Sequence, residues 1–225
     1  MTQVRAGETI TLDVVQRSPE WIKARLGRLT GSCADAMLSE GRGSKESAAR
    51  RNLRVALALE RITGEPQDES FYSKDMKRGE ELEAFARRAY EATTGRLLST
   101  VGFVSCVDLL AGCSPDALAV GVIDFKCPRP GNHLEYLRST KMPTEYERQL
   151  THNLWITGAP WAEMVSYCPQ FPEGARLCVR RIPYDAAAIA AYDKAARAFL
   201  AEVDLEVMAI ATMTSLHAVL SQAVA

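Results

Sequence analysis

The sequence predicts an α+β fold, with a mixed central sheet flanked by helices. Helical patterns dominate residues 18–95, short β-rich runs follow over 97–182, and a helical stretch returns over 185–222. This order lacks the regular alternation of strand and helix that builds a doubly wound parallel sheet. No internal repeat and no linker rich in Pro, Gly or Ser divides the chain, so we expect one domain over residues 1–225.

The N-terminal part carries start and stop signals for short helices. Ser18 followed by Pro19 is typical of a helix start, because the serine side chain can cap free backbone N–H groups and the proline has none to satisfy. We expect this helix to end at Gly27. A second short helix is expected to run from a cap at Ser32 to Gly41.

Two longer helices are expected next. Ser44 is placed to open a helix that ends at Gly64 and Pro66. Over Lys77–Thr94 the apolar residues recur at helical spacing, and Gly95 supplies the stop.

After residue 96 the pattern changes to short runs rich in β-branched residues, separated by Gly and Pro. We expect these runs to form an antiparallel meander, with strands over Leu97–Val107, Leu109–Cys113 and Ala117–Cys127. The remaining elements are expected to be a helix from Pro143 to Gly158, strands over Trp161–Cys168 and Arg176–Ile182, and helices that start at a cap on Asp185.

The composition excludes several classes of protein. With 225 residues, 47% hydrophobic and 24% charged, the chain is long and apolar enough to bury a core, which argues against disorder. Its longest apolar stretches, such as Met208–Met213, are too short to cross a bilayer, so we expect a soluble cytoplasmic protein without a membrane partner. Six cysteines without a CxxC pair disfavour zinc and iron–sulfur sites.

Charge is distributed unevenly along the chain. The formal net charge is −1, but residues 17–61 carry a net charge of +5, and the residues after Tyr184 a net charge of −3. The positive segment could face a polyanion such as DNA. The alternative interpretation is a solvated helix face.

The densest polar signal lies in the predicted strands. Residues two apart on a strand share one face, so Asp124 and Lys126 lie together while Ile123 and Phe125 face the core. A hairpin turn near Gly121 would bring Asp116 beside Asp124.

Two adjacent carboxylates repel each other unless they are protonated or bridged by a hard cation, for which Mg²⁺ or Mn²⁺ is suited. The backbone carbonyl of Phe125 could complete such a site, and Lys126 could hold a water molecule or stabilise developing negative charge. This chemistry suits phosphodiester hydrolysis. Taken alone, Asp124 and Lys126 are by default a surface strand pair, because three-residue matches are common by chance.

Five strings occur together in one order: Leu26-Gly27-Arg28-Leu29-Thr30-Gly31-Ser32, Arg78-Gly79-Glu80 before Glu83, Cys113-Ser114-Pro115-Asp116-Ala117-Leu118, Asp124-Phe125-Lys126-Cys127-Pro128, and Gln149 before Trp155. In this the chain resembles the lambda exonuclease family, also known as YqaJ-like viral recombinases or phage-type alkaline exonucleases, of the PD-(D/E)xK nuclease superfamily. The resemblance covers about residues 18–170 and implies a restriction-endonuclease-like core.

The resemblance also implies roles for individual residues. Asp116 and Asp124 would bind the metal, Lys126 would be the catalytic lysine, and Glu83 would contribute to a second magnesium site. For Glu83, a charged helix face with an ion pair to Arg87 is the alternative. Gln149 resembles the active-site glutamine of the family, with Asn153 on the same helix face.

The chain departs from the family pattern at two positions. Thr151 stands where many members have a second glutamine, and Asp124 stands where many have Glu.

A pocket for a 5′-phosphate is implied as well, formed by Arg25, Ser32 and Ser114. Arg42, in a glycine-flanked loop, could reach into DNA. We interpret Trp21 as part of the core face of the first helix, and expect His152 to line the site beside Gln149.

The resemblance implies a magnesium-dependent 5′ to 3′ exonuclease that digests one strand of linear double-stranded DNA and leaves 3′ overhangs for strand annealing. It implies a ring-shaped homotrimer around DNA and a single-strand annealing protein as partner. An endonuclease of the same superfamily that cuts internally or at DNA structures is one alternative. A catalytically silent DNA-binding module is another.

Overall fold

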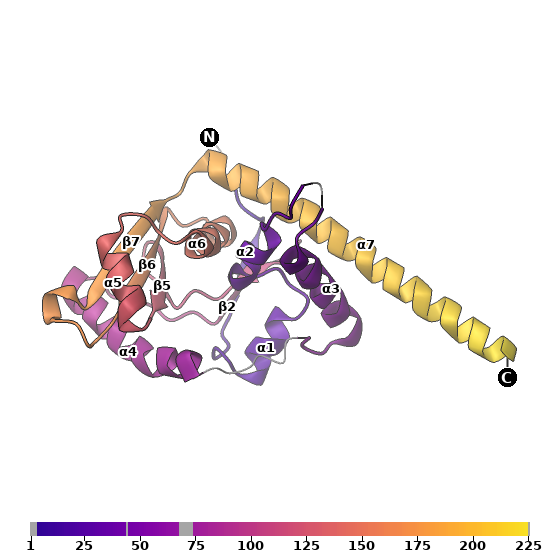
Figure 1. Cartoon of the computed structure of the whole chain (residues 1–225), viewed down its shortest axis with the longest axis horizontal. Coiled ribbons are helices and arrows are strands. Elements are labelled where there is room, and N and C mark those ends of the chain that lie inside the picture. The colour runs from indigo at the N-terminus through magenta and orange to yellow at the C-terminus, as the bar shows by residue number, and fades with distance from the viewer. Residues whose placement is uncertain (1–3, 44, 68–73, 225) are drawn as a thin grey trace.

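The centre of the computed structural model is a four-stranded sheet in the order β4-β5-β6-β7 (Figure 1). Residues 4–43, 45–67 and 74–224 are described, with side chains for all of them except 74–76 and 216–224. The strands are β4 (Ala117–Leu118), β5 (Val122–Lys126), β6 (Trp161–Tyr167) and β7 (Leu177–Pro183). Only β5 and β6 run parallel within this sheet, which makes it mixed, as the sequence predicts.

Helices cover both faces of this sheet. Helix α4 (Lys74–Thr94) packs on one face, where its Ala86 and Tyr90 join a core cluster with Ile123 and Phe125. Helix α6 (Thr144–Thr157) packs on the other face, where Leu150 lies in a second cluster. Because alternate residues of a strand point to opposite faces, β5 is buried on both sides. Asp124 is therefore enclosed under α6 and only 3% exposed.

A second sheet has the order β1-β2-β3, with β1 (Thr9–Leu12), β2 (Phe103–Cys106) and β3 (Gly112–Cys113) all antiparallel. Strand β1 was not expected from the sequence. The predicted single meander over residues 97–127 is wrong, because its strands are divided between the two sheets. The chain turns away between β3 and β4 at Ser114, Pro115 and Asp116, and the Pro115 carbonyl accepts a hydrogen bond from Gln16 instead of from a strand.

The N-terminal helices follow the predicted order with shifted boundaries. Helix α1 (Pro19–Arg25) begins at the Ser18 cap as predicted, and the Trp21 amide donates to the Ser18 hydroxyl. The cap predicted at Ser32 is wrong. Ser32 lies inside a 3₁₀ turn, η1 (Gly31–Cys33), which leads into α2 (Ala34–Met37), and its hydroxyl faces Thr30 and Arg25.

Helix α3 (Ala48–Thr63) starts at a cap on Ser47, whose hydroxyl accepts from the Arg50 amide. The predicted start at Ser44 lies outside the described residues. The predicted end is confirmed, since Gly64 has a left-handed φ of 70° that favours glycine.

The parallel pair β5 and β6 is connected through two helices, α5 (Pro130–Arg138) and α6. Helix α5 was not expected from the sequence. Its His133 is fully buried and bonds Ser166 of β6 and the Ala175 carbonyl in the turn η2 (Glu173–Ala175), which fastens α5 to the sheet.

Helix α7 (Ala186–Val224) is one long helix that starts on the Asp185 cap and continues past the body of the molecule (Figure 1). Helix α3 packs against it. Ion pairs connect the two helices, joining Arg50 to Glu202, Arg54 to Glu206, and Arg61 to Asp204. Part of the charge asymmetry in the sequence therefore comes from this internal interface. None of the helices in the described part is long and apolar enough to span a membrane.

Candidate active site

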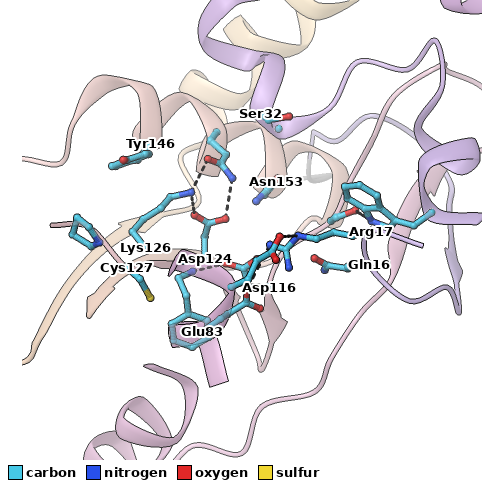
Figure 2. A pocket seen from close by; sticks show the side chains of 18 of the residues that line it. Gln16, Arg17, Ser32, Glu83, Asp116, Asp124, Lys126, Cys127, Tyr146 and Asn153 are labelled. Carbon is cyan, nitrogen blue, oxygen red and sulfur yellow. Dashed lines mark hydrogen bonds and ion pairs between the residues drawn. The ribbon is translucent and has the colours of Figure 1, made fainter. Parts of the chain in front are cut away.

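A cavity of about 490 Å³ opens where α1, η1, α4, β5 and α6 meet (Figure 2). Charged, polar and aromatic side chains dominate its wall. The residues that line it are Gln16, Arg17, Trp21, Arg25, Gly31, Ser32, Gly79, Glu80, Glu83, Ser114, Asp116, Asp124, Phe125, Lys126, Cys127, Pro128, Tyr146, Gln149 and Asn153.

Three carboxylates reach this cavity from three different elements. Asp116 precedes β4, Asp124 lies within β5, and Glu83 lies on α4. The Phe125 amide donates a 2.6 Å hydrogen bond to Asp116 Oδ2. This amide is available because β4 pairs only with Val122 and Ile123 of β5, so no strand faces the second half of β5 on that side.

The hairpin that the sequence predicts near Gly121 thus brings Asp116 against β5. In the described part of the chain, the side-chain positions do not form a ready set of three His, Cys, Asp or Glu ligands around one point.

The ionised form of the Asp116 carboxyl is unfavourable in this position. Burial raises the pKa of Asp116 well above its usual range, and the neighbouring charges of Asp124 and Glu83 raise it further. Burial is also the main reason why the pKa of Glu83 is raised, with Asp124 and Glu80 adding to the effect against the opposing charge of Arg17. Buried carboxylates that repel each other are the kind of donor set that a hard cation binds. The chemistry of these donors therefore suits a divalent metal ion, although the described side chains are not arranged around one point.

Lys126 is held by two side chains. Its Nζ lies 2.5 Å from Asp124 Oδ2 and donates to Gln149 Oε1 at 3.1 Å. The Gln149 amide in turn donates to Asp124 Oδ1 at 2.9 Å, so the three side chains form a closed ring of interactions (Figure 2). The Tyr146 ring lies 4.8 Å from Nζ and adds a cation–π contact.

Two opposing effects set the protonation of Lys126. Burial disfavours the ammonium form, but the negative charges of Asp124 and Asp116 outweigh it and raise the pKa of Lys126 above its ordinary value. In this arrangement Lys126 is a cation that can donate hydrogen bonds at neutral and mildly alkaline pH.

A second group of side chains that line the cavity is suited to an anion. Arg25 donates to the hydroxyls of Ser114 and Ser32, each at 3.4 Å, and its guanidinium lies 4.1 Å from the centre of the Trp21 ring. The Trp21 indole donates to Ser114 at 2.8 Å. The structure therefore brings together Arg25, Ser32 and Ser114, the three residues for which the resemblance implies phosphate binding. Trp21 lines the cavity as well, so our interpretation of it as a core residue is wrong.

Other predicted positions lie elsewhere. Arg42 is exposed and does not line the cavity. His152 is fully buried between Tyr192 and the Gly112 carbonyl, outside the cavity, so the expectation that it lines the site is wrong. Burial lowers the pKa of His152 to about 4.

The structure also places Thr151 and decides the alternative for Glu83. The side chain of Thr151 bonds the Glu147 carbonyl of its own helix and does not reach the cavity. The alternative for Glu83, an ion pair with Arg87, is not what the structure shows, because Arg87 pairs with Glu91 while Arg17 lies 3.8 Å from Glu83.

Sequence reasoning missed three residues of the site. Tyr146 precedes Gln149 by three positions on α6, and this helical spacing could have indicated that the two share a face. Gln16 and Arg17 belong to a turn before α1, and no motif marked them.

Comparison with known proteins supplies independent findings. A model of the YqaJ-like viral recombinase domain matches residues 20–160. The crystal structure of an alkaline exonuclease, LHK-Exo, from Laribacter hongkongensis is 31% identical, with a TM-score of 0.79, over 88% of this chain and 98% of that one. The structure of LHK-Exo in complex with dAMP gives a TM-score of 0.80 at the same identity and coverage.

A phage-related exonuclease from Haemophilus somnus 129PT shares the fold, with 16% identity and a TM-score of 0.67 over 81% of this chain and 96% of that one. No curated protein sequence shows significant similarity to the chain.

Proposed function

Since the chain belongs to the family of YqaJ-like viral recombinase domains, we propose that it is a magnesium-dependent exonuclease acting on linear double-stranded DNA. It degrades one strand from the 5′ end and leaves a 3′ single-stranded overhang for recombination by strand annealing. The main observation behind the proposal is that one cavity is lined by two groups of side chains. One is the carboxylate–lysine group, and the other is the anion-binding group around Arg25. The similarity to an alkaline exonuclease supports the same reaction class.

Asp116, Asp124 and the Phe125 carbonyl would hold the magnesium ion, with manganese as a substitute, and Glu83 would contribute to a second magnesium site. The ion, when bound, polarises a phosphate oxygen and lowers the pKa of a water molecule. The raised pKa values of Asp116 and Glu83 support this assignment, because a nearby cation would offset both the burial and the mutual repulsion that raise them.

Lys126 stabilises the negative charge that develops on the phosphate during hydrolysis. Its ammonium group is protonated and fixed by Asp124 and Gln149, so it requires no reorientation during the reaction. Gln149 contributes by holding both partners in one orientation, since its amide bonds both Lys126 and Asp124.

Arg25, Ser32 and Ser114 bind the 5′-phosphate of the strand to be cut. A guanidinium group gives bidentate contacts to phosphate, and two hydroxyls beside it can donate further hydrogen bonds. Trp21 keeps the guanidinium in place by stacking and by its bond to Ser114. LHK-Exo has been crystallised in complex with dAMP, a nucleotide with one phosphate, and this supports a site of this kind.

The direct test is a time course with Mg²⁺ at mildly alkaline pH. Linear duplex with labelled 5′-phosphate ends and covalently closed circles are incubated with the protein and with Lys126→Gln, whose fold is checked by circular dichroism. We expect mononucleotides from the linear 5′ ends, intact circles and an inactive variant. Cut circles would instead indicate an endonuclease, and a lack of cleavage with Mg²⁺ and Mn²⁺ would favour the binding module.

The proposal extends to a ring of three copies that encloses the DNA, and to an annealing protein that takes over the exposed strand. Helix α7 supports assembly, because it continues past the body (Figure 1) and exposes the apolar side chains Leu205, Met208 and Met213. Light scattering should give three times the chain mass of 24.7 kDa. A monomer at working concentrations would contradict the ring.

A further inference from the structure

The turn before α1 holds an arginine in a backbone conformation that suits glycine. The Ser18 amide donates to the Val15 carbonyl at 3.0 Å, which closes a β-turn with Gln16 and Arg17 at its centre. Arg17 has a φ of 71°, and among the described residues it is the one non-glycine residue with positive φ. The third position of such a turn normally carries Gly or Asn, because a β-carbon is strained there.

Neighbouring contacts fix this turn in place. Gln16 donates to the carbonyls of Val101 and Pro115 at 2.9 and 3.0 Å, which connects the turn to the segment that carries Asp116. Ser18 caps α1, the helix of Trp21 and Arg25. The conformation of Arg17 is therefore imposed by contacts on both sides of it.

The side chain of Arg17 contributes little to the fold that would offset this strain. Its Nε lies 2.8 Å from Glu80 and its Nη2 lies 3.8 Å from Glu83, both on α4. The arginine side chain is 54% exposed, and ion pairs of exposed arginines add little to stability. Glycine would suit the backbone better, so the stability of the fold does not account for an arginine at this position.

The location of Arg17 in the cavity wall explains better why an arginine occupies this position (Figure 2). Four carboxylates line the same cavity, namely Glu80, Glu83, Asp116 and Asp124, and an anionic strand that enters it meets repulsion from all of them. Arg25 is enclosed by Trp21, Ser32 and Ser114. Arg17 is the more exposed cation and stands directly beside the α4 carboxylates.

We propose that Arg17 binds a backbone phosphate of the DNA strand at the mouth of the cavity, separately from the terminal phosphate at Arg25. This inference rests on the proposed action on DNA. The guanidinium would exchange its contacts with Glu80 and Glu83 for a phosphate, which it can bind through two N–H groups. Its high exposure makes this exchange feasible without a change in the fold.

The test measures DNA affinity against salt concentration for wild type, Arg17→Gly and Arg17→Lys. Fluorescence anisotropy follows a labelled duplex in EDTA, where no strand is cut, with 5′-phosphate or 5′-hydroxyl ends. Arg138→Gln is the matched control, because Arg138 is exposed and paired with Glu135 on α5, outside the cavity.

We expect Arg17→Gly to keep or raise Tm and to weaken DNA binding roughly tenfold at low salt, as the loss of a charge-assisted contact does. The slope of log K against log salt should become shallower by about 0.9, the value for one lost phosphate contact. Both end types should be affected equally. Arg17→Lys should retain the wild-type slope, because it keeps the charge, and Arg138→Gln should behave as wild type.

An unchanged slope for Arg17→Gly would overturn the inference, whether or not affinity falls, since a structural role changes no phosphate contact. A loss confined to 5′-phosphorylated duplex would also overturn it, because it would assign Arg17 to the terminal phosphate. In both cases wild type still binds DNA and the proposed function stands. A wild-type protein without affinity for duplex ends would instead refute the proposed function and this inference with it.

Discussion

The Phe125 amide of β5 donates to the Asp116 carboxylate, just before β4 begins, at a distance of 2.6 Å. This single bond places a buried carboxylate beside Asp124 and Lys126, although the two aspartates are eight positions apart along the chain. The position is unfavourable for the charge of Asp116, since burial and the charges of Asp124 and Glu83 raise its pKa. Without a cation, such a site lowers the stability of the folded protein. A cation that binds the folded state raises that stability again.

The substitution Asp116→Asn should stabilise the metal-free protein at pH 8 while it abolishes cleavage. The pKa of Asp116 is raised in the folded state, so its contribution to stability is fully present below the unfolded pKa and is lost as pH rises through the folded pKa. The asparagine lacks the charge and can still accept from Phe125. Each kcal/mol of relieved repulsion should raise Tm by roughly 2–4 °C, measured by thermal unfolding in EDTA.

The exposed Asp108→Asn serves as the control for Asp116→Asn and should leave Tm unchanged. The gain at Asp116 should shrink as pH falls and should vanish below the unfolded pKa of about 3.9, where the wild-type carboxyl is protonated in both states. Addition of Mg²⁺ should raise Tm of the wild type but not of Asp116→Asn. A variant that is less stable than wild type at pH 8 would contradict the electrostatic account.

Removal of the Lys126 charge should destabilise the metal-free protein as well as stop catalysis. Asp124 is buried and would lose its ion-pair partner in Lys126→Met, which should cost about 3–5 kcal/mol of unfolding free energy. The pKa of Lys126 is raised, so this contribution is present below its ordinary pKa and is lost as pH rises through the folded pKa. Urea unfolding at pH 8 measures the loss.

The double variant Lys126→Met/Asp124→Asn separates the charge effect from a packing effect. With the buried charge also removed, most of the stability should return while catalysis stays absent. Equal stability of the single and double variants would show that packing, and not the unpaired carboxylate, is the cause.

Arg25→Ala should chiefly abolish the preference for 5′-phosphorylated ends. The guanidinium contacts both Ser32 and Ser114, so its loss leaves two hydroxyls without the charge that binds phosphate. We expect kcat/KM on phosphorylated ends to fall roughly tenfold or more, with little change on hydroxyl ends. Lys23→Ala, on the same helix but outside the cavity, is the control. Equal rates of wild type on both ends would argue against a phosphate pocket.

Arg50→Gln should lower stability without changing the salt dependence of DNA binding. Arg50 makes two hydrogen bonds to Glu202 of α7, and its guanidinium lies 5.1 Å from the centre of the Phe199 ring. Its charge is therefore paired within the interface of α3 and α7. We expect a loss of about 1–3 kcal/mol in unfolding free energy. Anisotropy at several salt concentrations should give the wild-type slope. A shallower slope would mean that Arg50 contacts DNA.

Local patterns predicted much of the fold. Ser18 with Pro19, Gly64, Gly158 and Asp185 mark helix boundaries correctly, because capping depends on residues close to each other in the chain. The strand register of Asp124 and Lys126 was equally predictable, since alternation along a strand is a local property. The ordered motifs identified the family, which the domain match and the alkaline exonuclease structure confirm.

Other features depended on contacts between distant segments. The meander over residues 97–127 was wrong because strand pairing is decided by partners such as β1 and β6, which lie far from it in sequence. Trp21 was assigned to the core because an aromatic residue on an amphipathic helix does not reveal whether its face meets a core or a cavity. Arg17 carried no signal at all, since its strained φ arises from the anchoring of the turn at Val101 and Pro115.

The sequence by itself determined the helix caps, the alternation within β5 and the chemical character of the site, because these follow from residue type and short spacing. Only the tertiary structure decided that the charges of α3 pair with α7, that Asp124 is buried under α6, and that Arg17 joins the carboxylates of α4. The physical reason is that burial and electrostatic partners depend on which surfaces meet when the chain packs, and those surfaces come from segments distant in sequence.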